Sequence, residues 1–350
     1  MPQLGKPPPE FMQRIILSRL GAERPELLQG SKFGVDNAIV KVADSTVAIC
    51  KTDPLSLIPG LGVERSAWLS VHLIASDIAT SGFPPCFAIF DLNLPPKMED
   101  EELERYWGGI HATCKTLNVA IAGGHTGRFV GCDYTIMGAG FMVGLGPEDR
   151  YLTSNMSQPG DRLLITKGAA IATTGILSHA FPKIIEQKLG KDFVQRAQRY
   201  MLQFSVVNDA LTAASIGVRG NGVTAMHDVT EGGILGGIFE MLHASGKGAR
   251  INKQAIRISD ETDEICKLFG INPLNALGEG ALVISVRPEK STEVQKALKK
   301  QNIPSYDIGE VLPSTEKIHI VHESEDVILK YPEKDSYWDA YWKAVSQGWN

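Results

Sequence analysis

The chain has 350 residues, 43% of them hydrophobic, and a formal net charge of −5. This length exceeds what one hydrophobic core usually organises, so two domains are expected. The acidic balance disfavours general binding to DNA or RNA, which needs concentrated lysine and arginine. No stretch approaches the roughly 18 consecutive apolar residues of a membrane span, and the start is too rich in proline and charge for a secretory signal. A cytoplasmic protein without a membrane or nucleic-acid partner is therefore expected.

Helices and strands are predicted in turn along the first 146 residues. A proline-rich arm precedes a helix over 10–21, which Gly21 would end. Apolar residues at helical spacing predict a helix over 64–80, and an acid-started segment predicts another over 99–118. Runs of β-branched and apolar residues predict strands over 37–42, 46–52, 86–95, 119–124 and 133–146, the first two as a hairpin.

A polar, turn-rich stretch at 146–161 marks the expected domain boundary. We therefore predict domains over 1–150 and 156–335, followed by an aromatic tail over 336–350 that packs on a surface. Strands are predicted over 162–168, 222–228, 280–286 and 305–312, and helices from 173 to about 214, over 232–245 and over 291–301. Strands and helices that alternate in this way indicate layered α/β (α+β) domains.

The cysteines and histidines give little support for transition-metal chemistry. The five cysteines form no CxxC pair, and their odd number and wide spacing argue against a disulfide framework. The eight histidines show no HExxH spacing. The sequence also lacks GxxxxGK[ST] and a dinucleotide-binding glycine pattern, which disfavours a P-loop and a Rossmann hydride-transfer site.

Four aspartates lie where predicted strands or helices end: Asp36, Asp53, Asp77 and Asp228. Asp77 is the most informative, because a carboxylate near the C-terminal end of a helix faces the negative pole of the helix dipole and needs a nearby cation. Mg²⁺ would meet that need, since it takes oxygen ligands and usually shares them with phosphates. A surface aspartate, paired with lysine or solvated, is the alternative for each acid alone.

Glycine pairs accompany the acids at Gly123 and Gly124 and at Gly232 and Gly233. Glycine lets a ligand approach backbone N–H groups closely, as in phosphate-binding nests, although tight turns are the alternative. At the second pair Thr230 is predicted to cap a helix whose free N–H groups would meet an anion.

Three further side chains have two interpretations each. His125 would contact a phosphate or act as an acid or base, or else only hydrogen-bond its loop. Lys51 and Lys167 would neutralise phosphate charge, or else remain solvated surface lysines.

Eight motifs occur in order: "VDNAIV", "KTDPLS", "SDIATSGFPP", "AGGHTG", "GDRLLITKG", "HDVTEGG", "LGEGALVIS" and "IGEVL". Together they resemble the aminoimidazole ribonucleotide synthetase (PurM)-related superfamily over roughly residues 33–312. Its members include thiamine-monophosphate kinase, the hydrogenase maturation protein HypE, selenophosphate synthetase and formylglycinamidine synthetase. The length and the "HDVTEGG" form most resemble the HypE-like branch.

The resemblance implies an N-terminal domain whose sheet forms a barrel with its twin across a homodimer, and a C-terminal α/β domain folded over it. It also implies ATP in the cleft, Mg²⁺ as cofactor, and phosphorylation of an acceptor oxygen by positioning and charge neutralisation. The residues implied are Asp36, Asp53 and Asp77 for the metal, Gly123, Gly124, Thr126, Lys51, Gly232 and Gly233 for the nucleotide, and Asp228 and His125 for catalysis.

Departures from the family motifs leave the acceptor open. Asn37 stands where the kinases have a second acid, and His125 replaces the acid of their "GGDT". No cysteine follows Cys266, so transfer to a C-terminal cysteine as in HypE is not expected, and none precedes Cys50 to serve as the selenophosphate synthetase cysteine. The leading hypothesis is activation of an oxygen of a small molecule or of a partner's carboxamide. A thiamine-monophosphate kinase-like enzyme and a non-catalytic ATP-binding assembly or sensor module are the alternatives.

Overall fold

A computed structural model describes residues 7–58, 60–332 and 334–349, and its first half is built on a six-stranded sheet. The strand order is β1-β2-β3-β6-β4-β5, antiparallel except for the parallel pair β4 and β5. The strands are β1 (Leu27–Gln29), β2 (Ala38–Ala43), β3 (Thr46–Ser56), β4 (Pro85–Leu94), β5 (Ala120–Arg128) and β6 (Ile136–Pro147).

Helices α2 (Val63–Ala79) and α3 (Asp100–Thr116) cover one face of this sheet and bury its apolar side chains. Chain segments α1 (Pro9–Met12) and η1 (Gln13–Leu17) precede the sheet. The opposite face is open within the chain and carries exposed apolar residues, among them Phe87, Ile89, Phe141 and Leu145. The sheet does not close on itself within the chain.

The second half contains a seven-stranded sheet of order β13-β12-β9-β11-β7-β10-β8. Its strands are β7 (Arg162–Thr166), β8 (Val223–Asp228), β9 (Gly248–Asn252), β10 (Leu282–Val286), β11 (Ser305–Leu312), β12 (Ile318–His322) and β13 (Glu325–Ile328). Its α-helices are α4 (Ile171–Ala180), α5 (Pro182–Leu189), α6 (Lys191–Gln198), α7 (Val207–Ser215), α8 (Gly233–Ser245), α9 (Asp260–Phe269), α10 (Pro288–Lys300) and α11 (Ser336–Ser346). Short helical turns are η2 (Ser154–Met156), η3 (Arg199–Gln203), η4 (Arg219–Asn221), η5 (Lys253–Ala255) and η6 (Pro273–Asn275).

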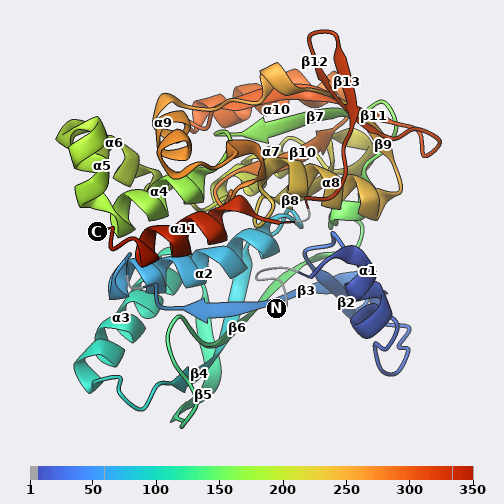
Figure 1. The fold of residues 1–350 in the computed structure, drawn as a ribbon. Helices are drawn as coiled ribbons and strands as arrows, with labels where there is room; N and C mark the ends of the chain where they lie inside the picture. The colour runs from blue at the N-terminus through green and yellow to red at the C-terminus, as the bar shows by residue number, and fades with distance from the viewer. Residues whose placement is uncertain (1–6, 59, 333, 350) are drawn as a thin grey trace.

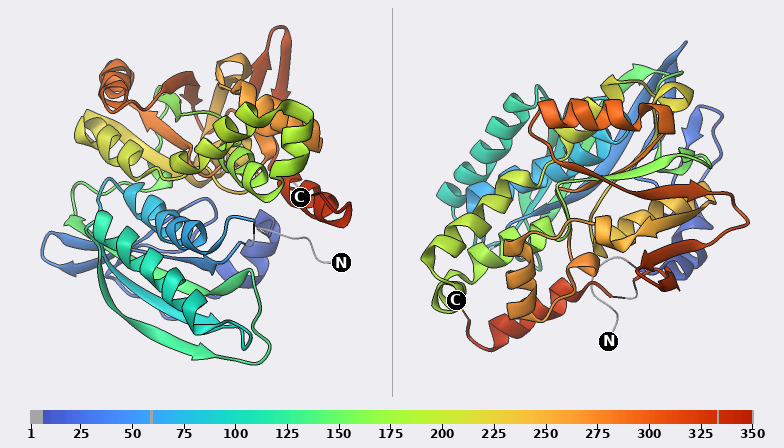
Figure 2. Two further views of the ribbon diagram at one scale, coloured as in Figure 1. Left: turned by 90° about the vertical axis from the view of Figure 1, so that its left-hand side faces the viewer. Right: turned by 90° about the horizontal axis from the view of Figure 1, so that it is seen from above.

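Helix α2 lies between the first sheet and the second half of the chain (Figure 1). The hydrophobic cluster under the first sheet continues through α2 into α7, β10 and α10. A second cluster joins α4, α8 and α9 on the other face of the second sheet. In both Figure 1 and the left view of Figure 2, α11 lies at the level where the two halves meet. Apolar packing therefore fixes the two halves against each other.

Most predicted helices and strands are present, but β1, β9, α9, β12 and β13 were not predicted, and two predicted helices differ. The helix predicted over 10–21 is only α1 and η1, and the long helical stretch from 173 to 214 is divided into several short helices. Strand β5 continues through the glycines at 123 and 124 as far as Arg128. The prediction that Thr230 caps α8 is wrong, because the N-cap residue is Gly232, which is in the left-handed conformation and has no side chain. Among the described residues, no helix is long and apolar enough to span a membrane.

Candidate functional site

Lys51 and two of the predicted metal-binding acids meet where β3 faces α2. Lys51 and Asp53 are two residues apart on β3, so their side chains leave the same face of the sheet. Asp77 lies in the last turn of α2. The Lys51 Nζ is 2.8 Å from Asp77 Oδ1 and 3.9 Å from Asp53 Oδ2. The cation that the helix position of Asp77 required is thus supplied, within the chain, by Lys51.

A second set of ionisable groups joins the two halves of the chain. Asp36 precedes β2, and its Oδ1 lies 2.5 Å from Nδ1 of His227 on β8. The other nitrogen of this imidazole, Nε2, is 3.0 Å from Oε2 of Glu240 on α8. Asp36 Oδ2 accepts a hydrogen bond of 3.0 Å from Ser154. His227 is therefore a buried link between two carboxylates from different domains.

Asp228 brings the two sets together at the carboxyl end of β8. Ligand atoms of Asp36, His227 and Asp228 lie within 4.8 Å of one another. Asp228 is also close enough to Asp77 to raise the pKa of that carboxyl. All four predicted acids and Lys51 therefore converge at the seam between the domains.

The pKa shifts in this cluster follow from burial and from the crowding of its carboxylates. Burial raises the pKa of Asp77 well above its usual value, and Asp228 adds to the shift while Lys51 opposes it. Burial would lower the pKa of Lys51, but the surrounding acids outweigh burial and raise it. The pKa of His227 is raised to about 10, because Asp36 and Glu240 outweigh its burial. A divalent cation would relieve the repulsion among these carboxylates.

The segment that leads into Asp36 is fixed on α8. Lys32 Nζ donates to the carbonyl of Ala244 over 2.6 Å. Gly34 has a φ of 77°, and a Cβ added to it would lie 2.2 Å from the carbonyl oxygen of Glu240, so only glycine fits there. The second domain thus helps to place an acid of the first.

Asn37 uses an amide donor that an aspartate would lack. Its Nδ2 donates to the backbone carbonyl of Asp77 over 2.8 Å and to Thr80 Oγ1 over 2.9 Å. The side chain therefore ties the Asp36 segment to the C-terminal end of α2.

The predicted phosphate contacts on β5 are not part of this cluster within one chain. Asp53 pairs with Gly140, Gly140 with Phe90, and Phe90 with Gly124, so three strand spacings of about 4.8 Å separate Asp53 from Gly124. A Cβ on Gly124 would lie 2.1 Å from the carbonyl oxygen of Phe90, so the neighbouring strand alone accounts for this glycine.

Three other predicted residues lie beside Gly124 on the exposed sheet edge. Gly123, His125 and Thr126 are exposed there. The ring of His125 stacks on that of Phe129 with centroids 6.1 Å apart.

Gly232 and Gly233 lie at the start of α8, a few residues after Asp228. The N–H of Gly232 does not face open space, because it donates to Asp335 Oδ2 over 2.8 Å. The same carboxylate accepts from the backbone N–H of Tyr337 over 2.8 Å. In this structure a carboxylate of the chain takes the anion position predicted there for a phosphate.

Lys167 is a structural side chain rather than a solvated one. It is buried, its Nζ is 3.0 Å from Asp209 Oδ1, and it donates to the carbonyls of Gln203, Ser205 and Gly280. These partners leave it no role at the acid cluster.

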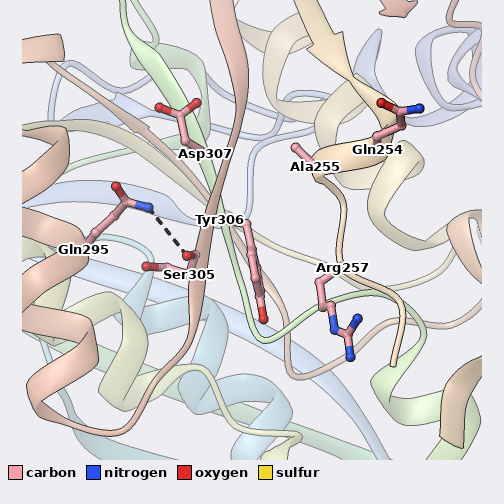
Figure 3. A pocket seen from close by; sticks show the side chains of 7 residues that line it. All are labelled: Gln254, Ala255, Arg257, Gln295, Ser305, Tyr306 and Asp307. Carbon is pink, nitrogen blue, oxygen red and sulfur yellow. Dashed lines mark hydrogen bonds between the residues drawn. The ribbon is translucent and has the colours of Figure 1, made fainter. Parts of the chain in front are cut away.

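A hollow lies elsewhere, lined by η5, the middle of α10 and the start of β11 (Figure 3). In it Gln295 Nε2 reaches the carbonyl of Ser305 over 3.5 Å, and Asp307 is paired with Arg162 from β7. The hollow contains none of the predicted site residues, so the candidate functional site is the acid cluster.

Sequence reasoning missed His227 and Glu240, although both carry a visible signal. His227 interrupts the apolar strand "VTAMHD", and Glu240 is a lone acid in the apolar helix "GGILGGIFEMLHAS". An ionisable group inside an apolar element needs a buried partner, and each of these is the partner of the other.

Two family models match the chain and together cover most of it. Residues 34–145 match the N-terminal domain of AIR synthase related proteins, and residues 158–322 match the C-terminal domain. The two-domain fold is therefore that of the ATP-using class of proteins related to AIR synthase. The chain belongs to the AIR synthase-related, PurM-like family and is similar to its HypE-like members.

Individual relatives agree with this assignment. A putative hydrogenase expression/formation protein of Methanocaldococcus jannaschii is 25% identical over 299 residues, 85% of this chain and 84% of the relative. Selenide, water dikinase of Escherichia coli is 27% identical over 316 residues, 83% of this chain and 86% of the relative.

Solved structures show the same fold. HypE in a HypE–HypF complex superposes with a TM-score of 0.71 at 16% identity, over 92% of this chain and 99% of that one. A ThiL protein solved with AMPPCP and TMP gives a TM-score of 0.67 at 19% identity, over 86% and 91% of the two chains.

Proposed function

We propose that this protein binds ATP with Mg²⁺ at the seam between its domains and transfers a phosphoryl group to an oxygen of an acceptor. The observation that carries the proposal is the convergence of Asp36, Asp53, Asp77 and Asp228 around Lys51. Four carboxylates from both halves of the chain form an oxygen-rich donor set, which suits Mg²⁺.

The residues of the cluster divide into two roles. Asp36, Asp53 and Asp77 would hold the metal, with Asp228 beside them, and the metal would neutralise phosphate charge. Lys51 holds Asp77 in place and restrains the repulsion among the acids while the nucleotide is absent. Because its side chain is partly exposed, Lys51 can also contact a phosphate once a metal takes over the pairing with Asp77.

A homodimer would complete the nucleotide site. The open face of the first sheet carries exposed Phe87, Ile89, Phe141 and Leu145, which a second copy of the sheet would bury. Packing of two such faces would bring β5 of one copy toward the other copy's seam. Gly123, Gly124, His125 and Thr126 would then contact the nucleotide of the partner rather than their own.

The acceptor is proposed to be a small molecule or a carboxamide of a partner protein. The named relatives support this range, because they include a hydrogenase formation protein, a dikinase that acts on selenide, and a ThiL protein bound to TMP. ATP binding without turnover is the second candidate, and the use of Asn37 as a structural donor favours it. Release of ADP that depends on an added acceptor would exclude the second candidate.

Calorimetric titration of ATP in the presence of Mg²⁺ tests the proposal. The unmodified protein should bind, and Asp53→Asn and Asp77→Asn should each weaken binding by at least about tenfold, because each removes a charged metal ligand. Asp44→Asn is the matched control, since Asp44 lies exposed in the turn between β2 and β3. Absence of binding at millimolar ATP, or equal binding by all three variants, would refute the proposal.

A further inference from the structure

A chain of polar contacts leads from the C-terminal segment to Asp36. The hydroxyl of Tyr331 donates to Glu240 Oε1 over 3.0 Å. Glu240 Oε2 is 3.0 Å from Nε2 of His227, whose Nδ1 is 2.5 Å from Asp36 Oδ1. One side chain from the C-terminal segment, one from α8 and one from β8 thus stand in series behind an acid of the first domain.

Aromatic packing couples the same two regions a second time. Phe33 lies three residues before Asp36, and its ring packs edge-on against Tyr331 with centroids 5.3 Å apart and planes at 79°. The ring of Phe33 also packs edge-on against His243 of α8, with centroids 5.7 Å apart. The backbone that leads into Asp36 is therefore held between α8 and the C-terminal segment.

We call residues 329–332 and 334–349 the C-terminal strap, and it is anchored firmly beyond Tyr331. The buried carboxylate of Asp335 accepts hydrogen bonds from the backbone N–H groups of Gly232 and Tyr337. Trp338 Nε1 donates to Glu231 Oε1 over 3.1 Å. The strap is thus fixed to the start of α8, while Tyr331 contacts the middle of the same helix.

From these contacts we propose that Tyr331 is a positioning residue for Asp36, so that the docked C-terminal strap holds this acid ready for the metal. The inference rests on the proposed function. Tyr331 fixes Glu240, Glu240 fixes the imidazole of His227, and His227 fixes one oxygen of Asp36 while Ser154 fixes the other. Partners behind a ligand orient it in this way and raise metal affinity.

Tyr331→Phe isolates the hydroxyl, because it keeps the ring that packs on Phe33. ATP is titrated by calorimetry at a series of Mg²⁺ concentrations and once in EDTA. The Mg²⁺ concentration for half-maximal ATP binding should rise about three- to tenfold, less than for loss of a direct partner of the acid. ATP binding in EDTA should stay within about twofold, because Tyr331 acts only through the metal ligand.

Two further variants test this result, one as a control and one with a larger expected shift in the Mg²⁺ midpoint. Tyr341→Phe is the matched control, because Tyr341 lies on α11 of the same strap and packs its ring on Phe181, 5.3 Å away. It should leave the Mg²⁺ midpoint unchanged. Glu240→Gln should shift the midpoint in the same direction as Tyr331→Phe and further, because Glu240 is one contact closer to Asp36.

The possible results separate the two proposals. An unchanged Mg²⁺ midpoint in Tyr331→Phe, or a fall in melting temperature with no change in the midpoint, would overturn the positioning role while leaving the proposed function standing. An equal shift in Tyr341→Phe would also overturn it. Failure of the unmodified protein to bind ATP at any Mg²⁺ concentration would overturn the proposed function, and the inference with it.

Discussion

Replacement of Lys51 by methionine tests the charge balance at the seam most directly. Lys51 lies 2.8 Å from Asp77, with side-chain exposures of 23% and 6%. Methionine keeps most of the chain length but leaves Asp77 beside Asp53 and Asp228 without its cation. Removal of one partner from a buried pair costs about 3–5 kcal/mol, and the partial exposure of Lys51 places the expected loss at the lower end.

The loss in free energy of unfolding should depend on pH, because protonation of Asp77 removes the buried charge that Lys51 no longer neutralises. Its pKa in the folded protein is already raised, so its contribution to stability is greatest below its unfolded pKa and is lost as the pH rises through the folded pKa. Lys51→Met raises the pKa of Asp77 in the folded protein further. The difference in free energy of unfolding between the unmodified protein and the variant therefore grows as the pH rises. Protonation of an ordinary aspartate costs only about 1.5 kcal/mol at pH 5, which limits the loss there.

We therefore expect Lys51→Met to lower the free energy of unfolding by about 3 kcal/mol at pH 8 and by about 1 kcal/mol at pH 5. Urea denaturation in metal-free buffer at both pH values measures this difference. Lys41→Met on the adjacent strand is the matched control, because its pair with Glu148 is more exposed and should contribute much less to stability. A loss that is equal at the two pH values, or equal to that of the control, would refute this account of the cluster.

Two further predictions test the placement of Asp36 and the open sheet face. Gly34→Ala should abolish Mg²⁺-dependent ATP binding and destabilise the fold by about 2 kcal/mol or more, since its Cβ would meet the carbonyl of Glu240. Gly21→Ala, with a similar φ of 79° and no atom within 4 Å of the added Cβ, should cost only about 1 kcal/mol in denaturation measurements. Phe141→Asp should convert a dimer to a monomer in sedimentation, whereas Leu202→Asp, which is 79% exposed in the second domain, should not. An unmodified protein that is already monomeric at micromolar concentration would contradict the dimer.

Local sequence patterns were sufficient for most of the first domain. Apolar residues at helical spacing located α2 to within a residue or two, and therefore placed Asp77 in its last turn. The need for a cation at that position follows from the helix dipole alone, and in the structure Lys51 lies there, as the alternative of pairing with a lysine predicts. The identity of the cation could not be predicted in the same way, because Lys51 reaches Asp77 only after β3 has packed against α2.

The glycines of β5 show where a local pattern leaves two interpretations open. The sequence predicts that this pair either contacts a phosphate or serves the chain's own packing, and the structure places it within the strand predicted over 119–124. Gly124 is needed because the carbonyl of Phe90 approaches it closely across the sheet. Sequence alone does not distinguish a glycine that makes room for a ligand from one that makes room for a neighbouring strand, since both avoid the same Cβ.

The remaining contacts depend on how the two domains meet. His227 and Asp36 are 191 positions apart in the chain, and nothing local to either residue identifies the other. Their ion pair forms only because apolar packing through α2 brings the carboxyl end of β8 onto the first domain. The hydrophobic contact is therefore the cause of the convergence, and the crowding of acids is its electrostatic consequence.

This order of causes explains why the cluster is suited to a ligand that binds and leaves. Among the described residues, the carboxyl groups of Asp36, Asp53, Asp77, Asp228 and Glu240 lie at the seam with Lys51 and His227, and their crowding favours their protonated forms. Apolar burial holds the two domains together. A cation that binds with its phosphates would therefore reduce the repulsion among the carboxylates. Without the excess carboxylates a metal would bind less favourably, and without the apolar packing the two domains would separate. On the proposed function, the crowded carboxylates within a frame held by apolar packing would make binding of a metal with its nucleotide favourable there.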